Sequence, residues 1–200
     1  HKYKGMAIAP YAFQVKAVLE NNGREVTIDA PVMYRWRDPV EGERLRELTV
    51  MPPVTANFTK TVFYFSGAEP KPRDIELILR SGPAPVKGKL KLKLPRGWKA
   101  SPSELAFSID APLTEKLVTV SATPPKKDMA CYMRVELNVG GKIYTHGQTV
   151  LEYDHLPILT LHPPAESHVV RVNVNGKSGA YGNKRLGYIM GSGDDIPPYL

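Results

Sequence analysis

Four histidines in the second half of the chain are the first candidates for chemistry: His146, His155, His162 and His168. A catalytic metal centre needs two or three histidine or carboxylate ligands that converge on one ion and leave a coordination position open. These histidines fall in separate predicted strands or loops, and the chain contains neither HExxH nor His-Pro-Asp-Asp. We therefore interpret them as structural or surface side chains, and we predict no metal site and no cofactor.

Nucleophilic catalysis would have to use Cys131, the single cysteine, together with a neighbouring base. Cys131 precedes Tyr132 at the start of an alternating segment, which favours a buried structural thiol. One sulfur cannot form an internal disulfide, and the serines lie in no GxSxG motif. We predict that the chain has no catalytic residues of its own and is not itself an enzyme.

Three shorter motifs have simpler explanations than ligand binding. Gly191-Ser192-Gly193 lacks the later glycine of GxGxxG and the Lys-Ser/Thr of a P-loop, which favours a turn. The adjacent Asp194-Asp195 pair fits helix capping, with calcium ligation as the alternative. Asn57-Phe58-Thr59 matches the N-glycosylation acceptor pattern, which has meaning only in a eukaryotic secretory protein.

The two tryptophans, Trp98 and Trp36, are the candidates for carbohydrate contact. An exposed indole can stack on the face of a sugar ring, whereas a tryptophan in a turn between strands often covers one end of a core. Trp98 follows Pro95-Arg96-Gly97, which is typical of such a turn, and Trp36 stands between two arginines. For both residues the core interpretation and the sugar-platform interpretation stay open.

The elements that must position these residues are strands, because the dominant periodicity is two. Residues 89–94 alternate lysine and leucine, which places three leucines on one face and three lysines on the other. The same alternation occurs in residues 13–17, 74–79, 117–121 and 169–174. Residues 41–48 could form one helical turn. We predict an all-β, antiparallel fold, because the links between strands are too short for parallel crossovers.

Turn residues mark two hairpins that begin a weak internal repeat. Asn22-Gly23 and Gly140-Gly141 each separate two predicted strands and can supply the positive φ that tight hairpins need. After each hairpin come a short strand, a loop of variable length and a further strand that runs into Pro52-Pro53 or Pro163-Pro164. Two tandem sandwich domains that end in the same way would have this pattern.

The spacing of the strands predicts three regions. Residues 53–165 form an immunoglobulin-like β-sandwich, and residues 1–52 are the closing strands of an earlier sandwich of the same kind. Residues 166–200 are a linker strand and the start of a following α/β domain. The alternative for this last region is a final strand and tail of the same sandwich.

Composition and charge narrow the classes of partner. With 42% hydrophobic and 24% charged residues, the chain lies in the range of ordinary globular proteins. Its formal net charge is +7, but lysine and arginine alternate with apolar residues and form no basic run, so we predict no nucleic-acid partner. No apolar run reaches 18 residues, and we predict no membrane span.

Residues 54–125 resemble the immunoglobulin-like domains of the NEW3, NPCBM-associated type that are attached to bacterial carbohydrate-active enzymes. The resemblance rests on Leu94-Pro95-Arg96-Gly97-Trp98 followed by Ser101-Pro102, and on Val118-Thr119-Val120 leading to Pro124-Pro125. It implies an immunoglobulin-like fold and a setting related to carbohydrates.

A wider resemblance covers nearly the whole chain. Residues 31–43, 52–54, 153–155 and 186–197 look like the region that follows the catalytic domain in large PIG-L (LmbE-like) deacetylases of Bacteroidetes-type bacteria. In that family a zinc-dependent N-acetylglucosamine deacetylase domain comes first, immunoglobulin-like domains follow, and an amidotransferase-like α/β domain can close the chain. The family's Ala-His-Pro-Asp-Asp zinc motif is missing here, so no catalytic residue is carried over.

The resemblance implies a non-catalytic accessory region that spaces and orients neighbouring domains of a periplasmic or extracellular deacetylase-like protein. The alternative function is a carbohydrate-binding module that uses Trp98 and nearby aromatic residues. The expected partners are therefore the neighbouring domains of the parent protein and, in the alternative, a carbohydrate.

Overall fold

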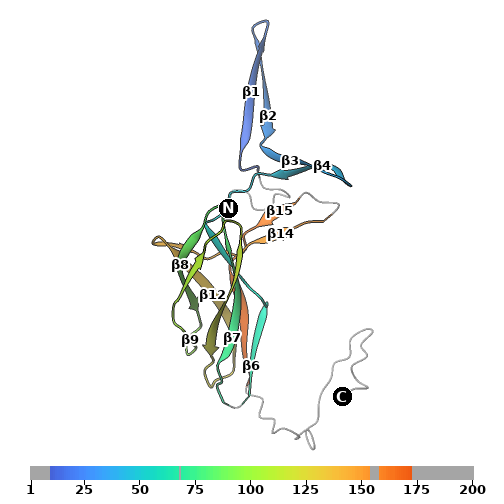
Figure 1. Ribbon diagram of the computed structural model, residues 1–200. Coiled ribbons are helices and arrows are strands. Elements are labelled where there is room, and N and C mark those ends of the chain that lie inside the picture. The colour runs from blue at the N-terminus through green and yellow to red at the C-terminus, as the bar shows by residue number, and fades with distance from the viewer. Residues whose placement is uncertain (1–9, 68, 154–157, 173–200) are drawn as a thin grey trace, which may run out of the picture.

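The computed structural model describes residues 10–67, 69–153 and 158–172. Every regular element within these ranges is a strand, which confirms the all-β prediction. Two sheets pack face to face as a β-sandwich, and three two-stranded hairpins lie beyond one end of it (Figure 1). In the described part of the chain, no helix has the length and apolar character that crossing a membrane requires.

The larger sheet of the sandwich has the strand order β10-β8-β12-β16-β6, and β13 pairs with β12 beside this path. These strands are β10 (Leu105–Ile109), β8 (Val86–Lys93), β12 (Met129–Val139), β16 (Glu166–Val172), β6 (Val62–Ser66) and β13 (Lys142–Tyr144). All pairs are antiparallel except β6 with β16. The prediction of a wholly antiparallel sandwich is therefore wrong at this edge, because the chain crosses between sheets before β6 and brings it alongside the last strand.

The smaller sheet has the order β5-β7-β11-β9, formed by β5 (Val54–Phe58), β7 (Arg73–Ser81), β11 (Glu115–Thr123) and β9 (Lys99–Ser101). This order, facing the order β8-β12-β16, reproduces the ABED and CFG sheets of an immunoglobulin-like sandwich. Strands β10 and β6 extend the second of these sheets at its two edges.

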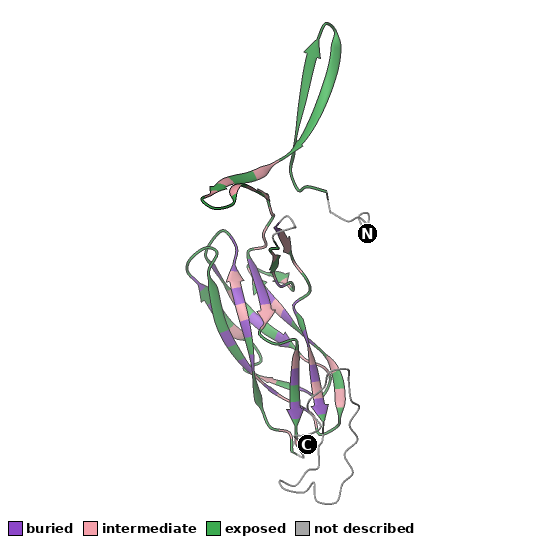
Figure 2. Ribbon diagram, turned by 90° about the vertical axis from the view of Figure 1, so that its right-hand side faces the viewer, coloured by how far each residue is buried: buried purple, intermediate pink, exposed green. Residues whose placement is uncertain are grey.

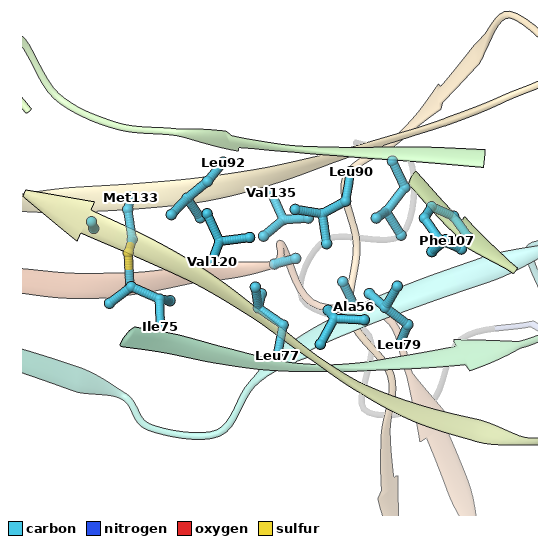
Figure 3. Close-up of a cluster of buried hydrophobic side chains, with 14 of the residues drawn as sticks. Ala56, Ile75, Leu77, Leu79, Leu90, Leu92, Phe107, Val120, Met133 and Val135 are labelled. Atoms are coloured by element: carbon cyan, nitrogen blue, oxygen red, sulfur yellow. The ribbon is translucent and has the colours of Figure 1, made fainter. Parts of the chain in front are cut away.

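The core lies between the two sheets and follows the predicted alternation. In β8, Leu90 and Leu92 are buried while the intervening lysines are exposed. Figure 3 shows these leucines facing Ile75 and Leu77 of β7, with Val135 of β12 beside them. Because one face of each sheet is apolar and the other charged, only one register buries the core.

The three hairpins beyond the sandwich are β1 (Gln14–Asn21) with β2 (Arg24–Pro31), β3 (Met33–Asp38) with β4 (Gly42–Glu47), and β14 (Thr149–Leu151) with β15 (Leu159–Leu161). The helical turn predicted over residues 41–48 is wrong, since residues 42–47 form β4. Register with β3 requires an extended conformation, and this pairing prevails over the weak helical pattern.

Both predicted tight turns are confirmed. Asn22 and Gly23 have φ of 53° and 73°, and Gly140 and Gly141 have φ of 56° and 83°. Two central residues with positive φ define the type I′ turn, whose twist matches that of the flanking strands. The repeat also recurs in the structure, because each long hairpin is followed by a short hairpin, a Pro-Pro pair and a further strand.

The end of the sandwich lies later than the predicted boundary at residue 165. Residues 166–172 form β16, which pairs with β12 on one side and β6 on the other. Ser167, Val169 and Arg171 point inward and are buried, so this strand closes the core and is not a linker. The start of a following α/β domain, with Gly191-Ser192-Gly193 and Asp194-Asp195, lies outside the described residues.

Candidate functional site

Trp98 lies in the loop between β8 and β9 and is 7% exposed. Its ring meets that of Phe65 edge to face, with centroids 4.7 Å apart and an interplanar angle of 87°. Its indole Nε1 donates a hydrogen bond to Sδ of Met129 at 3.2 Å. The indole therefore covers one end of the core, and its faces are not available for stacking on a sugar.

Arg171 stands at the same end of the core and was not among the residues that the sequence singled out. It is 1% exposed, and its guanidinium donates to the carbonyl oxygens of Pro125 at 3.2 Å, Phe65 at 3.1 Å and Val172 at 3.0 Å. A buried charge is tolerated when its donors are satisfied in this way. Arg171 thus ties β6, β16 and the loop after β11 together.

Trp36 lies outside the sandwich, on β3, and stacks on Tyr34. The ring centroids are 5.6 Å apart and the interplanar angle is 23°. Residues two apart on a strand share a face, so the two rings stand side by side along β3. Tyr34 is 62% exposed and Trp36 is partly exposed, which leaves an aromatic surface open to solvent.

Two arginines of β4 lie directly opposite this aromatic pair, since Arg46 pairs in register with Tyr34 and Arg44 with Trp36. The Arg44 guanidinium forms an ion pair with Glu41. Arg46 Nη2 donates to Oγ1 of Thr160 in β15 at 3.0 Å, so the two short hairpins β3–β4 and β14–β15 touch.

The turn between β3 and β4 is shaped by Asp38. Its Oδ1 accepts hydrogen bonds from the backbone N–H groups of Val40 at 2.8 Å and Glu41 at 2.9 Å. The bond from Glu41, and then the bond from Val40, hold the pKa of the Asp38 carboxyl below its usual value. A shallow hollow beside this turn is lined by Arg35, Trp36, Arg37, Gly42 and Glu43.

This hairpin can offer a ligand two kinds of contact. The open face of the Tyr34–Trp36 pair can stack on an apolar ring face, and the neighbouring polar groups can donate and accept hydrogen bonds. It contains no nucleophile paired with a base. The arrangement suits stacking against a flat group that has an apolar face and a polar edge.

The structure brings together two of the four histidines that the sequence analysis considered as candidates for chemistry. His146 and His162 line one groove with Met51, Pro52 and Tyr144. Burial lowers the pKa of His162, and the neighbouring His146 lowers it further. No described residue is hydrogen-bonded to Nε2 of His162. The sequence missed this pair because the two residues are brought together only by the pairing of distant segments.

The other histidines do not join the pair. The rings of His168 and Tyr132 meet edge to face on the outer surface of the larger sheet, with centroids 3.9 Å apart. His155 lies outside the described residues. Among residues 10–67, 69–153 and 158–172, no group of three or more His, Cys, Asp or Glu side chains could hold a metal ion.

The surroundings of Cys131 and Asn57 indicate structural roles for both residues. Burial raises the pKa of the Cys131 thiol, which keeps it protonated and poorly nucleophilic at neutral pH. The Asn57 side chain donates to the carbonyl of Gln148 at 2.7 Å and accepts from the N–H of Gln148 at 2.8 Å. Asn57 therefore joins β5 to the segment before β14, and these bonds occupy the amide that glycosylation would require.

Comparisons with known proteins assign no family. No protein-family model and no curated protein match the chain. A solved structure that matches is a family 123 glycoside hydrolase from Clostridium perfringens, with a TM-score of 0.31 and 8% identity. The match covers 62% of this chain and 28% of that enzyme, so the likeness spans less than a third of the enzyme.

Proposed function

We propose that this chain is a non-catalytic accessory region in which a β-sandwich spaces and orients neighbouring domains of a larger protein. The observation that carries the proposal is the twofold occurrence of the same order of elements. The two copies contact each other where Arg46 of one short hairpin bonds Thr160 of the other. A repeated unit with a contact between its copies is suited to holding domains at a set spacing.

Three further features support this role. Trp98 is buried in the core, so the most prominent aromatic residue of the sequence stabilises the sandwich. Pro52-Pro53 precedes β5 and Pro163-Pro164 precedes β16. Proline fixes its own φ and restricts the residue before it, so both joints are stiffer than ordinary loops.

The setting of this role follows from the resemblance to the region behind the catalytic domain of PIG-L-type deacetylases. We propose a periplasmic or extracellular parent protein whose deacetylase-like domain acts on N-acetylated sugars. In that protein the neighbouring domains are the partners of this chain, and residues 1–52 belong to the preceding sandwich.

Small-angle X-ray scattering of the complete gene product tests the spacer role. Replacing Pro52 and Pro53 by glycine should increase the radius of gyration and the flexibility of the particle, while the sandwich still unfolds in one cooperative transition. Scattering identical to that of the wild-type protein would contradict a stiff joint.

A second candidate function, carbohydrate binding, is favoured by the exposed Tyr34–Trp36 pair. Calorimetric titration of the 200-residue chain with N-acetylglucosamine oligomers and related polysaccharides tests it. Saturable heat that disappears in Trp36→Ala and persists in Tyr132→Ala, an exposed aromatic on the sandwich, would establish a binding site. No heat across the panel would leave the spacer role alone.

A further inference from the structure

The β1–β2 hairpin has one apolar face that nothing in the described structure covers. Side chains alternate along both strands, and cross-strand pairs such as Leu19 with Val26 and Ala17 with Ile28 share this face. We call it the dry face; its apolar members are Phe13, Val15, Ala17, Leu19, Val26, Ile28 and Ala30, and the polar pair Asn21 and Arg24 ends it at the turn. Every residue of both strands is exposed, and Figure 2 shows the hairpin exposed along its length and clear of the sandwich.

The opposite face of the same hairpin is polar. It carries mainly charged and hydrogen-bonding side chains, namely Gln14, Lys16, Glu20, Glu25, Thr27 and Asp29, with Val18 and Pro31 as the exceptions. Lys16 Nζ lies 3.9 Å from Oδ1 of Asp29 across the strands. A hairpin with one dry and one wet face has the pattern of two strands in a sheet whose dry face is covered.

The internal repeat shows what such a face packs against. Leu19 stands three residues before the first turn residue, Asn22, and Leu137 of β12 stands three residues before Gly140. The same count matches Ala17 with Val135 and Val15 with Met133. The three residues of β12 are 0–1% exposed, whereas Leu19 is 54% exposed. The dry face thus occupies the positions that form the core in the second copy of the repeat.

In the sandwich these β12 side chains are covered by the smaller sheet. Figure 3 shows Met133 and Val135 facing Ile75 and Leu77 of β7, with Val120 of β11 beside them. The covering surface is therefore an antiparallel sheet that presents Ile, Leu and Val at every second position, at the usual sheet separation of about 10 Å.

A second copy of this chain is a poor match for the dry face. Two strands of eight residues present a face of roughly 300–500 Å². Two such faces together reach at most the lower limit of a specific interface, about 1,000 Å². A covering sheet in the same polypeptide needs no such minimum, because the linkage raises its effective concentration to the millimolar range or above.

We propose that the dry face packs against the apolar face of an antiparallel β-sheet carried by the neighbouring domain of the same polypeptide, so that β1 and β2 are two strands of a second sandwich. This inference rests on the proposed spacer role and specifies its contact. Under this proposal each of the two sandwiches has a complete core of its own. A short stretch of chain joins the two sandwiches, and the hydrogen bond from Arg46 to Thr160 lies beside this joint.

Hydrogen exchange read by mass spectrometry tests the proposal in the complete gene product, with the 200-residue chain as reference. Leu19→Lys and Val18→Lys are matched variants, because the two residues are adjacent, nearly equally exposed at 54% and 56%, and on opposite faces. We expect β1–β2 amides to exchange at least about tenfold more slowly in the gene product than in the chain. Leu19→Lys should remove this protection and Val18→Lys should keep it.

Three outcomes would overturn the proposal. The first is equally fast exchange of β1–β2 in both proteins, and the second is an equal effect of the two lysine variants. The third is a dimer of the 200-residue chain in sedimentation equilibrium that Leu19→Lys dissociates, which would make a second copy the occupant. The scattering test of the proline joint is independent of all three, so the spacer role can fail or stand separately.

Discussion

The β12–β13 hairpin and the β1–β2 hairpin follow one sequence pattern and have opposite surroundings. Each has a type I′ turn, and in each the strand before the turn carries an apolar residue at every second position, from Met133 to Val139 in β12 and from Val15 to Leu19 in β1. Leu137 of the first hairpin is 1% exposed, whereas its counterpart Leu19 is open to water. Alternation in a sequence therefore specifies which face of a hairpin is dry, and a second sheet decides whether that face is buried.

Alanine substitution of the two tryptophans should give the largest difference in unfolding free energy between the sandwich and the hairpins outside it. Trp98→Ala opens the end of the core and should cost about 3–5 kcal/mol of unfolding free energy. Trp36→Ala changes a partly exposed side chain and should cost less than about 1 kcal/mol. Urea unfolding followed by far-ultraviolet circular dichroism measures both. Similar losses in the two variants would show that the β3–β4 hairpin is part of the cooperative core.

Alanine substitution of the two matched leucines, Leu137 and Leu19, should give the second-largest difference in unfolding free energy. Leu137→Ala removes buried methyl groups and leaves a cavity, so it should lower the unfolding free energy by about 2–5 kcal/mol. In the 200-residue chain, Leu19→Ala should change it by no more than about 0.5 kcal/mol. The same urea titration compares them. A large cost at Leu19 would mean that the dry face is already covered in this chain.

The turns of the two hairpins allow a smaller, symmetrical test. Gly23 and Gly141 have φ of 73° and 83°, and no atom lies within 4 Å of a Cβ added at either one. Alanine should therefore strain each turn by about 1–2 kcal/mol through its positive φ alone. Gly141→Ala should lower the global unfolding free energy by that amount. Gly23→Ala should only increase local opening of β1–β2, which amide exchange detects.

The smallest effect concerns pH and the β3–β4 turn. Hydrogen bonds lower the folded-state pKa of Asp38, so the stability it gives to the turn is complete above the usual aspartate pKa. This contribution is lost as pH falls from that value through the lowered pKa. The amide shift of Val40, followed by NMR from about pH 6 to pH 2, should report the loss. The transition should be missing in Asp38→Asn.

Much of the fold could be predicted from local patterns. The alternation of residues 89–94, the two glycine-containing turns and the repeat that ends in Pro-Pro correspond to strands, hairpins and a repeated order of elements. These features are set by residues close together in the sequence. Backbone sterics at the turns and the period of two fix them without reference to the rest of the chain.

The remaining features depend on residues that are distant in the sequence. The alternation of residues 169–174 does not reveal that Arg171 faces inward, because its acceptors include Phe65 and Pro125. The pairing of β6 with β16 likewise joins segments about a hundred residues apart. The residues around Trp98 and Trp36 in the sequence are compatible with burial or with exposure. Only the assembled sandwich shows that Trp98 is buried and that Trp36 is partly exposed.

Amide exchange of the 200-residue chain, resolved by NMR, tests the central comparison most directly. We expect amides of β12 to exchange only through global unfolding of the sandwich, whereas amides of β1 should exchange through local opening at rates faster by several orders of magnitude. Equal protection of β1 and β12 in this chain would contradict this expectation, because the dry face would then be covered without any neighbouring domain.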